Sequence, residues 1–172
     1  MEQKVTFGSL LKYGVLLGLV LIIINLIQIY VGNFIERDIS LAFMFLKAAA
    51  YVFFIYCAIR FAVNYFYAAN YSFAKGIKVA LFVGLIAAVL MAVYQYIEMK
   101  FIIPSEYAMQ LDAVTEELIE KGFPEEMGET VRSMFSTTVI ISVFIGTFLI
   151  SLLASLFIAP FFKQQQIVNI EE

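Results

Sequence analysis

The feature that most constrains this chain is an apolar stretch between Gly76 and Lys100, with the sequence GIKVALFVGLIAAVLMAVYQYIEMK. Within it, Val79 to Ile97 form a run of nineteen residues without a charge. At about 1.5 Å rise per residue this run spans about 28 Å as a helix, close to the ~30 Å hydrocarbon thickness of a bilayer. The stretch therefore predicts a membrane-spanning helix over about 76–100.

Small side chains recur at every fourth position of this expected helix. They are Gly76, Ala80, Gly84, Ala88 and Ala92. Small residues let helix backbones approach closely in lipid, where no hydrophobic drive brings apolar helices together. A period of four drifts by about 40° per step on a helix of 3.6 residues per turn, so the two halves of the row should face different neighbours. We expect this helix to be the packing centre of the fold; the alternative is that an alanine-rich helix has this spacing by chance.

Composition places the whole chain in the membrane class. Of its 172 residues, 63% are hydrophobic and 15% are charged, and the mean hydropathy is +0.92, whereas soluble domains are about half apolar and a quarter charged. The chain has no histidine and a single cysteine, so it lacks the usual ligands for zinc or haem and a Cys/His nucleophile pair. We expect no metal, no cofactor and no catalysis. Because basic clusters with interleaved aromatics are missing as well, we expect no nucleic-acid partner.

Three further apolar segments complete an expected all-α fold with four transmembrane helices in one domain, 1–172. They cover about 10–32, 41–66 and 134–162, the last ended by Pro160. The second segment contains Lys47 and Arg60, whose long side chains can reach the interface from a short apolar core.

The first and last segments also contain small residues at helix-contact spacing. In the first, Gly14 and Gly18 form a G-x-x-x-G pattern, which brings membrane helices together either within one chain or between two chains. In the last, Ser151 and Ser155 continue a row whose hydroxyls could bond across to another helix.

The polar stretch over about 101–132 predicts one amphipathic helix outside the membrane, on its surface or over the mouth of the bundle. Apolar residues recur in it at a 4-3-4 spacing, with Ser105 as the expected cap and Gly122 as the stop. The acids of this stretch lack the spacing of an EF-hand, so a solvated acidic face is favoured over a calcium site.

Basic residues in the connections predict the orientation. One side of the membrane would hold most of the basic residues of the short connections and tails, while the first connection, on the other side, has only Arg37. This side contains Lys4, Lys12, Arg60, Lys75, Lys78 and Lys163. We therefore expect a multi-pass protein of the bacterial inner membrane with both termini in the cytoplasm, although Lys100, Lys121 and Arg132 of the long connection weaken the count.

Polar side chains from all four helices are expected at one depth near the outer surface. They are Asn25, Gln28, Lys47, Gln95, Glu98 and Thr138. Polar groups in apolar surroundings are costly unless they pair, so we predict that Lys47 pairs with Glu98 in a small pocket open to the outside. The alternative is that the two charges reach the headgroups on different helix faces.

Four stretches in this order resemble the bacterial membrane proteins catalogued as domain of unknown function 4199. They are KYGVLLGLV, YSFAKGIKVALFVGLIAAV, VTEELIEKGFPEEM and SLLASLFIAPFFK. The resemblance implies four helices in a bacterial inner membrane. It implies no activity and assigns no functional residue, and the ending KQQQIVNIEE departs from the lysine-rich ending expected of the family.

Three functions are weighed for such a chain. The first is a non-catalytic accessory or assembly subunit, whose partners are the lipid bilayer and the helices of another membrane protein. The second is a transporter or channel protomer, which would need a homo-oligomer because four helices are few. The third is an enzyme acting on lipid, which would need converging acid, base or nucleophile groups that this chain offers sparsely.

Overall fold

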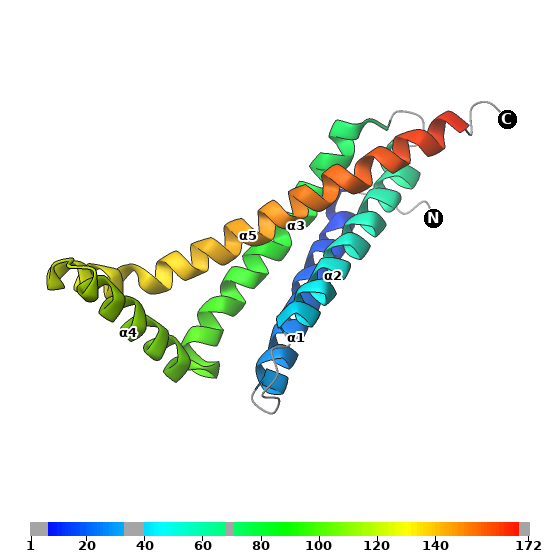
Figure 1. Ribbon diagram of the computed structural model, residues 1–172. Coiled ribbons are helices and arrows are strands. Elements are labelled where there is room, and N and C mark those ends of the chain that lie inside the picture. The colour runs from blue at the N-terminus through cyan, green and yellow to red at the C-terminus, as the bar shows by residue number, and fades with distance from the viewer. Residues whose placement is uncertain (1–6, 33–39, 68–70, 169–172) are drawn as a thin grey trace.

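The computed structural model describes residues 7–32, 40–67 and 71–168, and every regular element within these ranges is a helix. After a short 3-10 turn over Phe7–Leu10, single π-helical turns prolong the second helix over Val63–Tyr67 and the third over Glu98–Ile102. The helices are α1 (Leu11–Gly32), α2 (Ser40–Ala62), α3 (Phe73–Ile97), α4 (Pro104–Glu120) and α5 (Glu125–Val168). Figure 1 shows α1 and α2 side by side, with α5 lying obliquely across α3.

Four helices of the described residues are long and apolar enough to cross a membrane. They are α1, α2, α3 and α5 with their short extensions. The fourth helix in the chain, α4, has 17 residues and is not among them. The fold is therefore all-helical, with four segments of membrane-spanning character.

The last helix is longer at both ends than the predicted span over 134–162. It begins at Glu125, because Pro124 precedes its first turn and the acids there suit the positive end of the helix dipole. No break separates this turn from the apolar run. At the other end α5 continues through Pro160 to Val168; the proline ring removes one backbone donor, a loss that membrane helices tolerate.

α3 is the central helix of the bundle. It packs against α1, α2 and α5. Within its most apolar window 44% of the residues are buried, compared with 28%, 22% and 17% for the windows of α1, α2 and α5. The largest fully buried apolar side chains of the described residues are Leu10, Leu17, Leu21, Ile55, Ile59, Val79 and Val83.

The first half of the small-residue row on α3 faces α5. A Cβ atom added to Gly84 would lie 2.4 Å from the Cβ of Ser151, and one added to Gly76 would lie 2.9 Å from the Cβ of Ala159. Both distances are too short for real carbon atoms, so any side chain at these positions would separate the two helices. Ala80, between these two glycines, and Ala88, after them, are fully buried, and Ala92 at the end of the row is half-buried.

The two glycines of α1 pack against a different row on α3. A Cβ on Gly14 would lie 2.7 Å from the Cβ of Ile86, and a Cβ on Gly18 would lie 2.7 Å from Cδ1 of Leu90. The G-x-x-x-G pattern thus joins two helices of the same chain. α5 therefore packs against the small residues of α3, while larger side chains of α3 fill the space left by the glycines of α1.

The hydroxyls of Ser151 and Ser155 on α5 bond to their own helix and not across to α3. Both of these serines are fully buried. Ser151 donates to the Thr147 carbonyl over 2.9 Å, and Ser155 donates to the Leu152 carbonyl over 2.6 Å. A serine inside a helix can satisfy its hydroxyl in this way, so the small size of these residues is what the contact with α3 uses.

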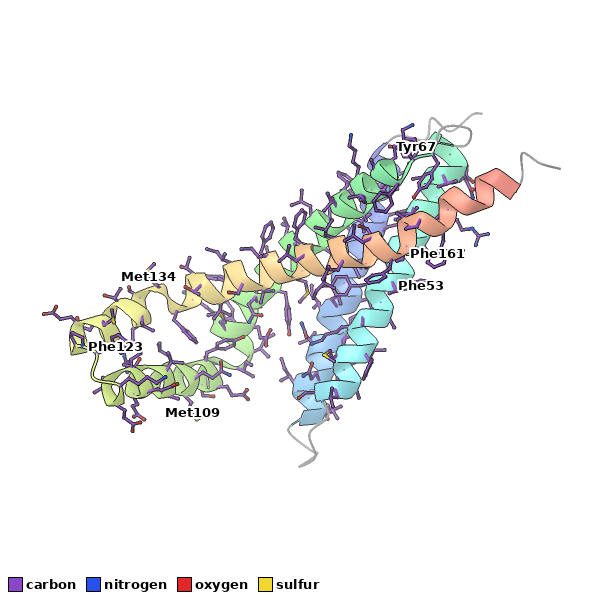
Figure 2. The ribbon with its side chains drawn as sticks, turned by 45° about the horizontal axis from the view of Figure 1, so that its top comes forward. Phe53, Tyr67, Met109, Phe123, Met134 and Phe161 are labelled. Atoms are coloured by element: carbon purple, nitrogen blue, oxygen red, sulfur yellow. The ribbon has the colours of Figure 1, made fainter. Side chains whose placement is uncertain are left out.

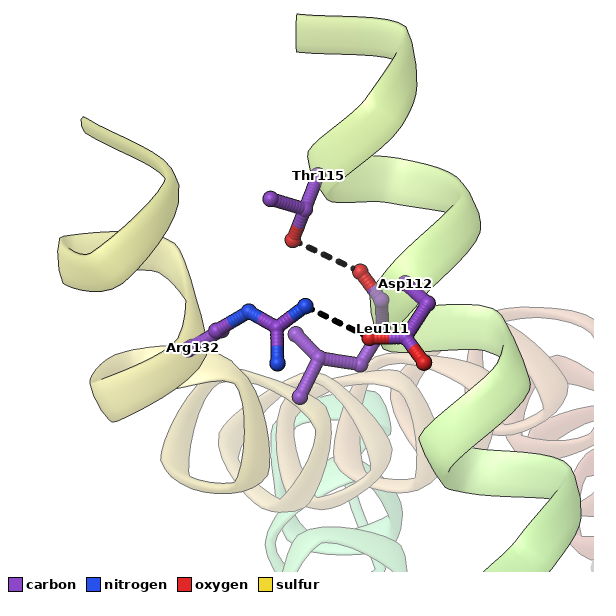
Figure 3. A network of polar contacts seen from close by, with 4 residues as sticks. All are labelled: Leu111, Asp112, Thr115 and Arg132. Atoms are coloured by element: carbon purple, nitrogen blue, oxygen red, sulfur yellow. Dashed lines mark hydrogen bonds and ion pairs between the residues drawn. The ribbon is translucent and has the colours of Figure 1, made fainter. Parts of the chain in front are cut away.

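α4 and the first part of α5 form a hairpin, residues 104–139, which we call the arm. Figure 1 shows it standing away from α1 and α2, joined to the bundle through the end of α3 and the body of α5. Arg132 of α5 donates to Asp112 of α4 over 2.6 Å (Figure 3). A Cβ on Gly128 would lie 2.8 Å from Cγ2 of Thr115, so the two helices of the arm are in close contact there.

The ends of α4 differ in one respect from the prediction. The helix begins at Pro104 with Ile103 as the cap residue, so Ser105 lies within the first turn. Proline suits this first position because its fixed φ matches the helix and its missing N–H would have no partner. Gly122 follows the helix with a φ of +82°, the left-handed conformation that ends helices.

Candidate functional site

Polar side chains from α1, α2, α4 and the π-helical turn after α3 surround a cavity of about 440 Å³ at the end of the bundle next to α4. Four of the six residues predicted for the polar pocket line it. The complete lining is Asn25, Gln28, Ile29, Gly32, Lys47, Glu98 and Glu106. We call this space the polar cavity.

Lys47 points into the bundle. Its ammonium donates a hydrogen bond of 2.8 Å to Oε1 of Gln28, which links α2 to α1. The side chain is half-buried, and a charge in such surroundings needs a polar partner. The amide of Gln28 provides that partner within the same chain.

Glu98 lies at the start of the π-helical turn that follows α3, and only 8% of its surface is exposed. The described residues hold no ion pair between it and Lys47; their ion pairs join Lys121 with Glu117 and Arg132 with Asp112. The expected Lys47–Glu98 ion pair is therefore not formed: Lys47 donates to Gln28, and its charge interacts with that of Glu98 only over a longer distance. Both charges nevertheless line the same cavity.

Gln95 and Tyr107 attach the arm to the bundle beside the polar cavity. Gln95 is buried on α3, and its Nε2 donates to the hydroxyl of Tyr107 on α4. Burial raises the pKa of Tyr107 above its ordinary value, and the nearby Glu98 carboxylate raises it further. Tyr107 thus places α4 against the polar end of α3.

Thr138 is the predicted pocket residue that lies elsewhere. It is exposed on the arm and lines none of the cavities described for the protein. Its depth was counted from an expected helix start at 134, whereas α5 begins at Glu125 and crosses α3 obliquely. Farther along α5, Val143, Gly146, Thr147 and Ile150 line the cavity described next.

A second cavity of about 390 Å³ adjoins the polar one and is mostly apolar. The two cavities share Asn25, Gln28 and Lys47. The second cavity continues from these residues between α1, α2, α3 and α5, and we call it the apolar cavity. Its remaining lining is Leu21, Ser40, Met44, Ala48, Tyr51, Met91, Val143, Gly146, Thr147 and Ile150.

Two residues of this site, Glu106 and Tyr107, were not predicted as pocket residues. Tyr107 begins the apolar 4-3-4 pattern of the predicted loop helix, but nothing in the sequence indicates that its hydroxyl meets Gln95. Glu106 precedes it and faces the polar cavity. The only available signal was the short distance in the chain between Glu98 and the start of α4.

The hydroxyl of Tyr94 is buried near the site. Tyr94 stands one turn before Glu98 on α3, and its hydroxyl interacts with the Glu98 carboxylate. This end of α3 therefore combines a buried carboxylate with a buried phenol hydroxyl beside it.

The site offers binding groups more than reactive ones. One ammonium, two carboxylates and two amides face the polar cavity. Among the described residues no three His, Cys, Asp or Glu side chains lie close enough together to hold a metal ion. What the arrangement can do chemically is hold a polar or charged group at the end of an apolar channel.

The family model described as a protein of unknown function, DUF4199, matches residues 12–164. The chain belongs to this family. No curated protein and no solved structure shows significant similarity to it. The match includes three of the four apolar spans of this DUF4199 protein completely, the first span from residue 12 onward, and every residue that lines the two cavities.

Proposed function

We propose that the protein is a non-catalytic accessory or assembly subunit that associates with the helices of another membrane protein. The observation that carries this proposal is the arm, which extends from the bundle with large apolar side chains exposed (Figure 2). Met109 is 64% exposed and Met134 is 59% exposed. Exposed apolar residues are expected where a span faces lipid, but these lie on a hairpin that stands away from α1 and α2 (Figure 1).

The chemistry of the arm suits a protein partner. Three of its exposed apolar residues are methionines, whose flexible and polarizable side chains adapt to different surfaces. Exposed acids of α4 lie on the same hairpin, so we propose that α4 lies outside the hydrocarbon as an extramembrane helix. A partner would then meet the arm at the level of the headgroups. The exposed apolar residues are Met109, Val114, Ile119, Phe123, Met127 and Met134.

A photoreactive amino acid at Met134 or Met109, activated in intact cells, tests this proposal. We expect covalent adducts with a second membrane protein at both positions. A matched control is Phe53, which is 60% exposed on α2, away from the arm. Equal adduct formation at Phe53, or the absence of a protein adduct at both arm positions, would contradict the proposal.

A second candidate is a transporter or channel protomer, and the polar cavity is the observation that favours it. A buried carboxylate and an inward-turned lysine are typical of solute pathways in membrane proteins. Four spans are few for a pathway, so this function would need a homo-oligomer. Adducts that contain only copies of this chain would favour this candidate over the first.

For its setting, we propose a bacterial inner membrane with both termini in the cytoplasm and the whole chain as one domain. The proposal is supported by the excess of lysine and arginine in the connections and tails assigned to the cytoplasmic side. The polar cavity, next to α4, then opens toward the outside.

A further inference from the structure

We propose that the two cavities together bind one lipid with a zwitterionic headgroup of the phosphoethanolamine type. The headgroup would occupy the polar cavity, and one acyl chain would extend into the apolar cavity. This inference is independent of the accessory function proposed above, since it concerns a ligand held within the bundle.

The cavities form one site because they share part of their walls. Asn25, Gln28 and Lys47 line both cavities, so one molecule that contacts these residues can extend into both spaces. Each volume, about 440 and 390 Å³, lies in the range of small-molecule sites, roughly 300–1,000 Å³. An elongated ligand that is polar at one end and apolar at the other matches this division.

The position of the site along the helices matches one leaflet of a bilayer. Gly32, which ends α1, lines the polar cavity, and Leu21 lines the far part of the apolar cavity. The rise along the helix from Gly32 back to Leu21 is about 16 Å. Half of a ~30 Å hydrocarbon core is about 15 Å. The polar cavity therefore opens at headgroup level, and the apolar cavity, whose lining runs from Ser40 at the start of α2 to Leu21, reaches toward the middle of the membrane.

The charges of the polar cavity favour a zwitterion over an anion. Lys47 provides one positive charge, whereas Glu98 and Glu106 provide two negative charges. A primary ammonium can donate to both carboxylates, and a phosphate can accept from Lys47. Because Gln28 uses its Oε1 to hold Lys47, its Nε2 is left as a donor for phosphate oxygens. An anionic headgroup without an amine would leave both carboxylates facing a negative ligand.

The apolar cavity contains a position at which it can be filled without disturbing the fold. Gly146 lines this cavity, and a Cβ atom added to it would meet nothing within 4 Å. Gly146→Leu should therefore occupy the space proposed for the acyl chain. Ser142→Leu, one turn earlier on an exposed face of α5, is the matched control.

Native mass spectrometry of the full chain in maltoside micelles tests the proposal. The probes are dioleoyl phosphatidylethanolamine, dioleoyl phosphatidylglycerol, free phosphoethanolamine and oleate. We expect phosphatidylethanolamine to be retained about tenfold better than phosphatidylglycerol, and each half-molecule to bind at least about tenfold more weakly than the whole lipid. A tenfold change corresponds to about 1.4 kcal/mol.

The variants locate the site. Glu98→Gln and Glu106→Gln should each abolish most of the headgroup preference, whereas Glu117→Gln on the exposed face of α4 should keep it. Gly146→Leu should reduce retention of the whole lipid about tenfold, and Ser142→Leu should leave it unchanged. Glu106 is partly exposed, so its variant remains informative if Glu98→Gln fails to fold.

Three results would overturn the proposal. Equal retention of the two phospholipids would exclude selection of the ammonium. Binding of phosphoethanolamine alone as tightly as the whole lipid would exclude the apolar half of the site. A similar loss in the control variants would exclude the location.

Discussion

Lys47 of α2 donates a hydrogen bond of 2.8 Å to the side-chain oxygen of Gln28 on α1. A bond with a charged donor contributes about 1.5–3 kcal/mol when its environment is shielded from water. It turns a cation of a membrane helix toward the interior and fixes α2 beside α1. It also leaves the buried Glu98 facing the same cavity without an ion-pair partner among the described residues.

Double-mutant cycles should reproduce this arrangement. Lys47→Met and Gln28→Met each remove the bond, so their combined cost should be smaller than the sum by about 1.5–3 kcal/mol. Lys47→Met and Glu98→Gln should couple less strongly than this, as expected of two charges that line one cavity without forming an ion pair. The free energy of unfolding in mixed detergent micelles is the measurement. A larger coupling with Glu98 than with Gln28 would mean that the ion pair exists after all.

The contact between α3 and α5 should be intolerant of a single methyl group at Gly84. A Cβ there would lie 2.4 Å from that of Ser151, so Gly84→Ala should destabilise the protein by about 1–3 kcal/mol. Gly146→Ala is the control because its Cβ would meet nothing within 4 Å. It should be neutral, or stabilising by up to about 1 kcal/mol through helix propensity. The same loss in both variants would remove the special role of the close approach.

Docking of the arm should depend on pH through Tyr107. Burial and the Glu98 carboxylate raise the pKa of this tyrosine above its ordinary value of about 10. The folded state therefore binds the phenol proton more tightly than the unfolded state does. The stability from this group is fully present below pH ~10 and is lost as the pH rises through the raised pKa.

The mobility of a spin label at Gln110 reports this loss. Between about pH 9 and 11 the label should become more mobile in the wild-type background, while Tyr107→Phe should remove most of the change. The remaining tyrosines are common to both proteins. An identical pH dependence in the two would show that Tyr107 is not the responsible group.

The spans could be predicted from the sequence because each depends only on a local property, an apolar run long enough to cross a bilayer. The arm could not. Met134 and Thr138 belong to an uncharged stretch that reads as part of a span, and hydropathy does not indicate where a helix leaves its bundle. Its direction is set by the contact of Gly84 with Ser151 and by the connection after Glu98, and both are tertiary features.

The depth of the candidate-site residues in the membrane could be predicted from the sequence, but which of their side chains pair could not. Counting turns from the helix ends brought Asn25, Gln28, Lys47 and Glu98 to one level, and these four line one cavity. Which groups meet within a level depends on how each helix is rotated about its axis. That rotation follows from packing, so the choice of Gln28 over Glu98 as the partner of Lys47 could not be read from spacing.

Cysteine labelling should decide the orientation. In a Cys57→Ser background, cysteines at Ser40 and Gln110 should react with an impermeant thiol reagent in intact cells, and a cysteine at Ala74 should not. All three positions are exposed, so accessibility within the fold does not bias the comparison. Reaction at Ala74 alone would invert the proposed topology.

The most direct test of the accessory function is the mass of the complex that contains this chain after mild extraction from the membrane of its host. The account predicts an assembly whose mass is the 19.5 kDa of this chain, or a multiple of it, plus that of a different membrane protein. Replacing Met109 and Met134 by glutamine should release the second protein. A mass equal to 19.5 kDa or to a whole-number multiple of it, with nothing else bound but lipid, would contradict the account.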